Sequence, residues 1–193
     1  MRGSVGAGLL ALVALAALGA GSGPAGAQQL ESAYTEVNLD ACSLVESDDF
    51  GSRWACPGYR GIPVMIAEGD LRFFVSYGLT SMQEKAAGQT LPPFNHLGEM
   101  IEWRLSNAEG RWRPFATILR YVTAREQGDK EAQILVVTRL GEGATCHVAY
   151  IDATANPDAN VLARKAADER ARDFDCGNDA PGYVGRFEAW ELE

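Results

Sequence analysis

Residues 145–176, TCHVAYIDATANPDANVLARKAADERARDFDC, decide the fold because they join a strand pattern to a helix pattern between two cysteines. The segment CHVAYIDA is rich in β-forming residues and follows a glycine-containing turn, which predicts a strand. The following segment, NPDANVLARKAADERARDF, has apolar residues at the spacing of one helix face: Ala159, Leu162, Ala163 and Ala166. We therefore expect a helix after this strand, close to the sheet because its apolar face is mostly alanine.

The predicted helix has signals at both ends. Asn156 is a suitable N-cap, Pro157 fits the first helical position, and Asp158 complements the positive end of the helix dipole. Arg170 and Arg172 lie near its negative end. The sequence contains no other comparably clear helix.

A block of strands precedes this helix. The segments MIEWRLS, WRPFATILRYVTA, QILVVTRL and TCHVAYIDA are β-rich, and short links separate them. Short links favour antiparallel neighbours, so the block predicts a four-stranded meander. Pro114 suits an edge position or a bulge.

The first half of the chain has a second group of strands. The segments SAYTEVNLDAC, RWACPGY and IPVMIAEGDLRFFVSYG predict three or four strands, with the turn of a hairpin at residues 68–70. Between the first two, SLVESDDFGS is interpreted as an acidic loop. Residues 78–98 lack a sustained period and are interpreted as a long loop that connects two halves of the sheet.

These elements predict one α+β domain that is mostly β. We expect an antiparallel sheet or small barrel of about seven to eight strands, with one C-terminal helix packed on it. The domain is expected to span residues 28–193, which is long enough to bury a core without a structural metal.

The first 27 residues have the pattern of a cleaved secretory signal peptide. They contain Arg2, an apolar run from Leu9 to Ala20, and small residues at Ala25 and Ala27. The run is shorter than the roughly 20 residues that a membrane-spanning helix needs. An uncleaved signal anchor is the alternative. No later apolar run is long enough to span a bilayer, so the remaining chain is not expected to be membrane-embedded.

The charge of the chain limits its partners. The formal net charge is −9, and removal of Arg2 with the signal would leave −10. A polyanion such as nucleic acid would be repelled by this field. No polybasic amphipathic helix is present in the sequence for binding anionic lipid.

The four cysteines are interpreted as two disulfides. An even number of cysteines in an exported chain is typical of disulfide bonding, and three pairings are possible. We favour Cys42–Cys56 and Cys146–Cys176, because each pair then closes a locally coherent unit. A zinc site is the alternative, but the sequence has no C-x-x-C motif and no matching histidine spacing. No metal site is therefore assigned, although the acidic segment around Asp175 has the oxygen-rich composition of a weak calcium site.

The adjacent Cys146 and His147 do not form a catalytic pair in this interpretation. Successive side chains of a strand point to opposite faces, and an oxidised cysteine offers no thiolate. His147 is instead expected to be a sheet histidine with a local partner. The sequence has no recognisable hydrolase, metalloprotease or phosphate-binding motif, so no catalytic residue and no cofactor are assigned.

An arginine-rich hairpin is the main candidate for binding. Between Trp103 and Arg125 the chain carries five arginines, several aromatic residues and one carboxylate, Glu109. Guanidinium groups pair with carboxylates and stack on rings, a composition typical of binding surfaces. The predicted binding residues are Arg104, Arg111, Trp112, Arg113 and Arg120. The alternative is a solvated strand face paired to local carboxylates.

The segments RWACPGYRGIPVMIAEGDLRFFVSYG, TCHVAYIDA and NPDAN together resemble exported bacterial proteins of unknown function. The resemblance implies no activity, ligand or site residue. The sequence as a whole favours a non-enzymatic periplasmic or secreted binding module that recognises a protein or an anionic envelope component. The alternatives are a small hydrolase-type enzyme that uses His96 or His147, and a structural or stress-related envelope protein. The sequence does not indicate an oligomeric state.

Overall fold

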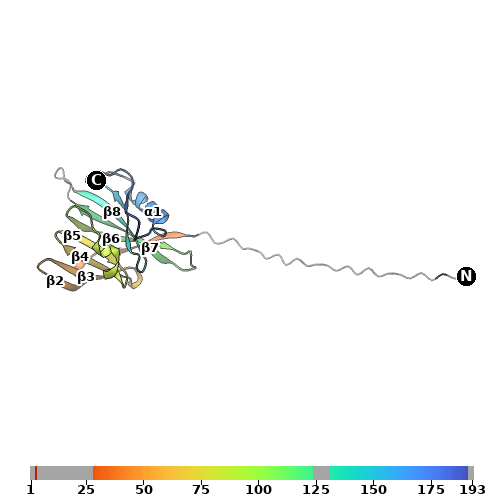
Figure 1. Ribbon diagram of the computed structural model, residues 1–193, viewed down its shortest axis with the longest axis horizontal. Helices are drawn as coiled ribbons and strands as arrows, with labels where there is room; N and C mark the ends of the chain where they lie inside the picture. Colours follow the sequence, from red (N-terminus) through yellow and green to blue (C-terminus); the bar gives the residue numbers. More distant parts are fainter. Residues whose placement is uncertain (1–2, 4–27, 124–130, 191–193) are drawn as a thin grey trace.

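A computed structural model describes residues 3, 28–123 and 131–190 (Figure 1). Apart from Gly3, the predicted signal peptide lies outside these residues, as does Arg125. The strands are β1 (Leu30–Glu36), β2 (Ser43–Asp48), β3 (Gly51–Pro57), β4 (Pro63–Gly69), β5 (Arg72–Tyr77), β6 (Asn95–Ser106), β7 (Arg113–Thr123), β8 (Ala132–Arg139), β9 (Cys146–Asp152) and β10 (Gly182–Tyr183). The helices are α1 (Ala159–Arg170) and the short 3-10 helices η1 (Leu39–Ala41), η2 (Tyr59–Gly61), η3 (Ser81–Gln83) and η4 (Lys85–Gly88).

The strands form two open sheets, which confirms the mostly-β fold with one C-terminal helix. The larger sheet has the order β1-β6-β7-β8-β9-β10, and the smaller has the order β2-β3-β4-β5. The predicted meander is present as β6 to β9, with each strand antiparallel to the next. Neither sheet closes into the barrel that was the other expected form, and the described residues contain ten strands rather than seven to eight.

The molecule has three layers, which are the smaller sheet, the larger sheet and α1, and a hydrophobic core lies between each adjacent pair (Figure 1). One core lies between the two sheets and includes Ile66, Trp103 and Tyr121. The other lies between the larger sheet and α1 and includes Ile151 and Ala163. β7 and β8 contribute residues to both cores, so both of their faces are buried, which explains why their sequences are so apolar.

The segment interpreted as an acidic loop is a strand and a turn. β2 pairs with β3, and the Asp48 side chain accepts hydrogen bonds from the backbone N–H groups of Phe50 and Gly51 in the turn. Every residue of β2 is exposed, so neither face shows the apolar alternation that identifies a strand in sequence. The loop interpretation was wrong for this reason.

The β4–β5 hairpin has its turn one residue later than predicted. Asp70 and Leu71 are the two residues between the strands, with φ values of 51° and 58°. Positive φ at both positions is typical of the hairpin turn that matches the twist of the strands. The Glu68 side chain accepts a hydrogen bond from the Leu71 N–H.

The helix begins later than predicted, and Asn156 is not its cap. Helix α1 starts at Ala159, and Asp158 occupies the N-cap position without a side-chain capping bond. The Asn156 side-chain amide instead donates a hydrogen bond to the Arg186 carbonyl oxygen at 2.6 Å and accepts one from the Arg186 N–H at 3.0 Å. Asn156 therefore fastens the C-terminal segment to the start of the helix.

Both predicted disulfides are confirmed. Cys42 is bonded to Cys56, and Cys146 to Cys176. The first joins the segment before β2 to β3, and the second joins β9 to the segment after α1. In the part of the chain that the structure describes, no helix is long and apolar enough to cross a membrane.

Candidate anion-binding site

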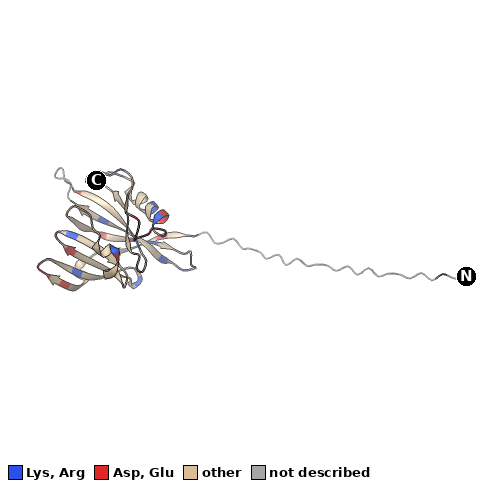
Figure 2. Ribbon diagram, viewed as in Figure 1, with Lys and Arg blue, Asp and Glu red and all other residues tan. Residues whose placement is uncertain are grey.

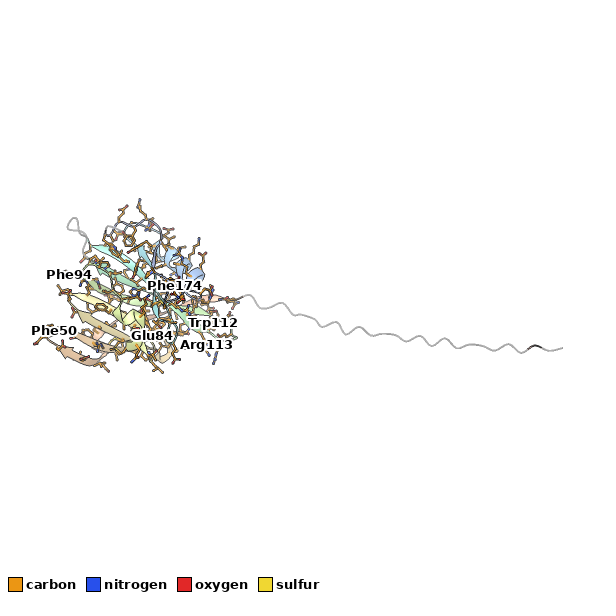
Figure 3. All side chains as sticks on the ribbon, viewed as in Figure 1. Phe50, Glu84, Phe94, Trp112, Arg113 and Phe174 are labelled. Carbon is orange, nitrogen blue, oxygen red and sulfur yellow. A yellow bond between two sulfur atoms is a disulfide. The ribbon has the colours of Figure 1, made fainter. Side chains whose placement is uncertain are left out.

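Four arginines surround a cavity at one end of the larger sheet. Arg111 and Arg113 come from the β6–β7 hairpin, Arg139 ends β8, and Arg172 follows α1. The cavity has a volume of about 260 Å³, and Glu109 is the one carboxylate residue in its lining. We call this site the arginine pocket. Figure 3 labels Arg113 and Trp112 at this end of the molecule, opposite to Phe50 and Phe94.

A β-bulge shapes the wall of the arginine pocket. Leu105 pairs with Pro114 and Arg104 pairs with Ala116, which leaves Phe115 as the extra residue of β7. Bulges re-aim side chains, and Phe115 packs in the core beneath α1. The Arg172 guanidinium lies 4.7 Å from the centre of the Phe115 ring, a cation–π contact that holds Arg172 over this wall. Pro114 adjoins this bulge, one of the two positions predicted for it, whereas β7 lies between β6 and β8 and is not an edge strand.

Arg139 is fixed by the end of the helix. Its Nη1 donates to the carbonyl oxygens of Ala171, Arg172 and Phe174, at 3.2, 2.7 and 2.6 Å. A cation at this position is favoured by the negative end of the helix dipole. Its Nε is buried and has no hydrogen-bond partner among the described residues. The Arg139 guanidinium is therefore held rigidly at the pocket, where its positive charge contributes to the local field.

The charges around the arginine pocket are not balanced. Glu109 contacts Arg113 at 3.3 Å, but both side chains are more than half exposed. An exposed pair of this kind contributes about 0.2–1 kcal/mol, so a ligand carboxylate can replace Glu109 at little cost. Four guanidinium groups against one carboxylate give the pocket a local positive field in an acidic protein.

A larger, mostly apolar hollow adjoins the arginine pocket. Its volume is about 500 Å³. Ile62, Tyr77 and Leu79 line it from one side, and Gly141 and the carboxylate residue Glu142 line it from the β8–β9 turn. It shares Arg113, Pro114 and Leu140 with the arginine pocket. We call this hollow the apolar groove.

Glu84 holds the floor of the apolar groove in place. Its carboxylate accepts hydrogen bonds from the backbone N–H groups of Gly143 and Thr145, at 2.7 and 2.9 Å, and from the Thr80 hydroxyl at 2.7 Å. Burial raises the pKa of Glu84, but these hydrogen bonds outweigh it and leave the pKa below its ordinary value. Of residues 78–98, expected to be a connector, residues 78–94 join the two sheets and brace the β8–β9 turn. The expectation is wrong for the last four residues, because they begin β6.

The structure brings together only some of the predicted binding residues. Arg111 and Arg113 line the arginine pocket. Trp112 lies beside them but is partly buried and packs against the core between the sheets. Arg104 is buried and bonded to Asp168 of α1, and Arg120 bonds Gln133 of the neighbouring strand. Neither arginine fits the alternative of a solvated face paired to local carboxylates, because Arg104 is buried against a distant aspartate and the partner of Arg120 is an amide.

Sequence reasoning missed Arg139 and Arg172. They lie 26 and 59 positions after Arg113, outside the arginine-rich hairpin. The meander contains a partial signal, because antiparallel pairing places Arg139 opposite Ala116, close to the start of β7. The predicted Cys146–Cys176 disulfide is a second partial signal, because it ties the segment after Arg172 to Cys146, the strand partner of Arg139.

Neither histidine lies at the arginine pocket or the apolar groove. His96 is exposed on β6 opposite Val122. His147 is buried, and its Nδ1 lies 3.0 Å from the Tyr150 hydroxyl, the local partner that was expected. A bulge at Val148 shifts the alternation of side chains along β9, and the His147 ring contacts the Tyr150 ring. Burial lowers the pKa of His147 to about 3, so its imidazole is neutral at pH 7.

The acidic segment after α1 forms a hydrogen-bonded turn. Asp175 accepts hydrogen bonds from Gly177 N–H and the Asn178 amide, and Asp179 accepts one from the Asp175 N–H. Within residues 28–123 and 131–190, no group of three or more histidine, cysteine or acidic residues is arranged to hold a metal ion.

Comparisons with known proteins add no family. No protein-family model, curated protein or solved structure matches the chain. The arrangement of side chains is therefore the basis for a functional proposal.

Proposed function

We propose that this chain is an exported, non-enzymatic binding module of the periplasm or the extracellular space, and that it captures an anionic partner in the arginine pocket. The observation that carries the proposal is the convergence of four arginines, from three separate elements, on one cavity with one carboxylate. Arginine's planar guanidinium pairs with carboxylates through two parallel hydrogen bonds, which suits it to this role.

The disulfides support the extracytoplasmic part of the proposal. Disulfides persist in oxidising compartments and are rare in the cytosol. All four cysteines are paired, and the chain begins with the pattern of a secretory signal. A fold cross-linked by two disulfides also suits a binding role, because it holds the pocket residues in fixed positions.

The electrostatics support recognition of a discrete anion rather than a polyanion. The net charge of −9 opposes approach of an extended polyanion, whereas the local field of the pocket attracts a single acidic group. Figure 2 shows acidic residues on the β2–β3 end of the molecule, away from the hairpin that carries Arg111 and Arg113. In the smaller sheet, Arg53 and Arg72 are paired with carboxylates, whereas the arginine pocket has one carboxylate for four arginines.

Nuclear magnetic resonance titration of the oxidised protein tests the proposal. The probe is the blocked peptide Ac-Glu-Gly-Glu-Gly-NH2, which offers carboxylates without apolar side chains. We expect its addition to shift the signals of the arginine-pocket residues. The double variant Arg111→Glu/Arg113→Glu should bind the probe at least tenfold more weakly, since two attractive charges become repulsive.

The matched control reverses the charge of two cationic side chains outside the pocket. Lys165 and Arg170 are exposed on α1 and do not line the pocket, so Lys165→Glu/Arg170→Glu changes the net charge equally. The control should bind the probe within twofold of the parent chain. Equal binding by the pocket variant and the parent, or shifts distributed away from the pocket, would refute the proposal.

A further inference from the structure

We infer that the arginine pocket and the apolar groove form one continuous site for an extended acidic polypeptide segment of another protein. The segment places a carboxylate side chain among the arginines and a nearby apolar side chain in the groove. The inference rests on the proposed function, because it assigns a ligand class to the same pocket.

The two hollows are contiguous through three residues. Arg113, Pro114 and Leu140 line both, so a ligand bound to one extends directly into the other. In an extended segment, alternate side chains lie on the same side at a separation of about 6.8 Å. The inferred segment therefore has its acidic residue and its apolar residue two positions apart, on the side that faces the two adjoining hollows.

The apolar groove has a rim that a partner would cover. Leu79 is 93% exposed, although it lines the groove. The adjacent Gly78 has a φ of 92°, a conformation that other residues rarely adopt, and this backbone presents Leu79 at the rim. An exposed large apolar side chain beside an apolar hollow, with arginines at one end, has the composition of a protein interface.

A polypeptide fits this site better than a lipid chain does. Both hollows are open on one side, so a lipid chain in the groove would keep one side in water. A peptide backbone in the same position can form hydrogen bonds with water along its open side. The arginines and the exposed leucine then contact alternate side chains of the segment.

A second copy of this chain is the competing occupant. The β2–β3 hairpin carries exposed Leu44, Val45 and Phe50 beside Glu46 and Asp48, which is the same acidic and apolar chemistry. Figure 3 places Phe50 at the end opposite to Arg113, so such contacts would join copies head to tail. The net charge of −9 on each copy opposes this association, so we assign the site to a different protein.

Three blocked peptides and one fatty acid test the inference by the same titration. Ac-Glu-Gly-Leu-NH2 carries both groups, Ac-Gln-Gly-Leu-NH2 lacks the charge, Ac-Glu-Gly-Gly-NH2 lacks the apolar side chain, and octanoate is the non-peptide amphiphile. We expect the first peptide to shift signals of both hollows and to bind at least fivefold more tightly than each of the other three probes.

A groove variant separates this inference from the proposed function. Leu79→Ser should reduce binding of Ac-Glu-Gly-Leu-NH2 to the level of Ac-Glu-Gly-Gly-NH2, while binding of the latter stays unchanged. The matched control is Leu71→Ser, since Leu71 is 62% exposed on the β4–β5 turn and lines neither hollow. This control should bind both peptides as the parent chain does.

Each outcome has a distinct meaning. If none of the anionic probes perturbs the arginine pocket, the proposed function fails and this inference fails with it. If Ac-Glu-Gly-Gly-NH2 binds the pocket as tightly as Ac-Glu-Gly-Leu-NH2, the pocket binds anions but the groove assignment is wrong. Tighter binding of octanoate than of the peptide also overturns the inference, as does concentration-dependent self-association in analytical ultracentrifugation that Phe50→Ser abolishes.

Discussion

Arg104 of β6 and Asp168 of α1 are joined by two hydrogen bonds, from Nε to Oδ1 at 2.9 Å and from Nη2 to Oδ2 at 2.7 Å. The Arg104 side chain is 8% exposed, and its Nη1 also bonds the Ser32 hydroxyl of β1. A second pair, Glu102 with Arg164, lies between the same two elements. The helix layer is therefore held to the sheet by paired charges as well as by its small alanine face.

Asp168→Ala should lower the free energy of unfolding by about 3 kcal/mol, because it leaves the buried Arg104 guanidinium without its carboxylate. Urea denaturation followed by circular dichroism measures the change. The control is Glu169→Ala, which removes an exposed pair with Lys165 at 4.0 Å and should cost less than about 0.5 kcal/mol. A loss at Asp168 no larger than at Glu169 would show that the Arg104 pair does not fasten the helix.

The sequence predicted those elements whose apolar residues follow one period. The strands β6 to β9 were found because runs of β-forming residues alternate with short links, and the helix because its apolar residues share one face. The disulfides were found because each closes a local unit. β2 was missed because all its residues are exposed. The position of Asn156 next to the helix suggested a cap, but its partner, Arg186, is 30 residues away.

The arginine pocket was predictable only in part, because its residues meet through tertiary packing. Arg111 and Arg113 stand out as cations in an acidic chain, and both line the pocket. Arg104 lies in the same arginine-rich part of the sequence, yet it is on a strand that packs against α1, where its guanidinium is bonded to Asp168. Which arginines have carboxylate partners depends on which elements pack together, and local composition does not contain that information.

Replacing Cys146 and Cys176 together by serine should lower the free energy of unfolding by about 3–4 kcal/mol, because the unfolded chain regains the entropy of a loop with a sequence separation of 30. Guanidinium denaturation of the oxidised parent and the variant measures the difference.

The matched comparison is the Cys42→Ser/Cys56→Ser variant, whose pair has a sequence separation of 14. The chain-entropy relation gives it a loss that is smaller by about 0.7 kcal/mol. The first pair connects an exposed edge hairpin, whereas the second connects β9 to the segment beyond α1. A larger loss at the first pair would contradict the loop-entropy account.

Leu71→Gly should raise the free energy of unfolding by about 1 kcal/mol, because glycine adopts a positive φ without the steric cost that a side chain brings. Leu71 has a φ of 58° and is 62% exposed, so little packing is lost with its side chain. Thermal denaturation measures the gain as a higher Tm.

Gly110→Ala supplies the reverse control for the turn prediction. Gly110 has a φ of 76° in the β6–β7 turn, and no atom lies within 4 Å of the position where a Cβ would stand. The cost of alanine is therefore conformational, and we expect a loss of about 1 kcal/mol. Stabilisation by Leu71→Gly without destabilisation by Gly110→Ala would mean that backbone strain is not the cause.

His147 should make the protein lose stability as the pH falls from about 6.5 toward 3. Burial lowers its pKa to about 3 in the folded chain, whereas the unfolded imidazole has a pKa of about 6.5. Between these values the unfolded state binds the additional proton, so stability is fully present above pH 6.5 and falls as the medium becomes acidic. By linkage, the loss between pH 7.5 and 5 is about 2 kcal/mol.

The variant His147→Gln tests this account. It should be less stable than the parent at pH 7.5, because it loses the contact with Tyr150. Between pH 7.5 and 5, its free energy of unfolding should change by about 2 kcal/mol less than that of the parent. Urea denaturation at both pH values measures this difference, and parallel pH profiles for the two proteins would show that His147 does not stay neutral in the folded state.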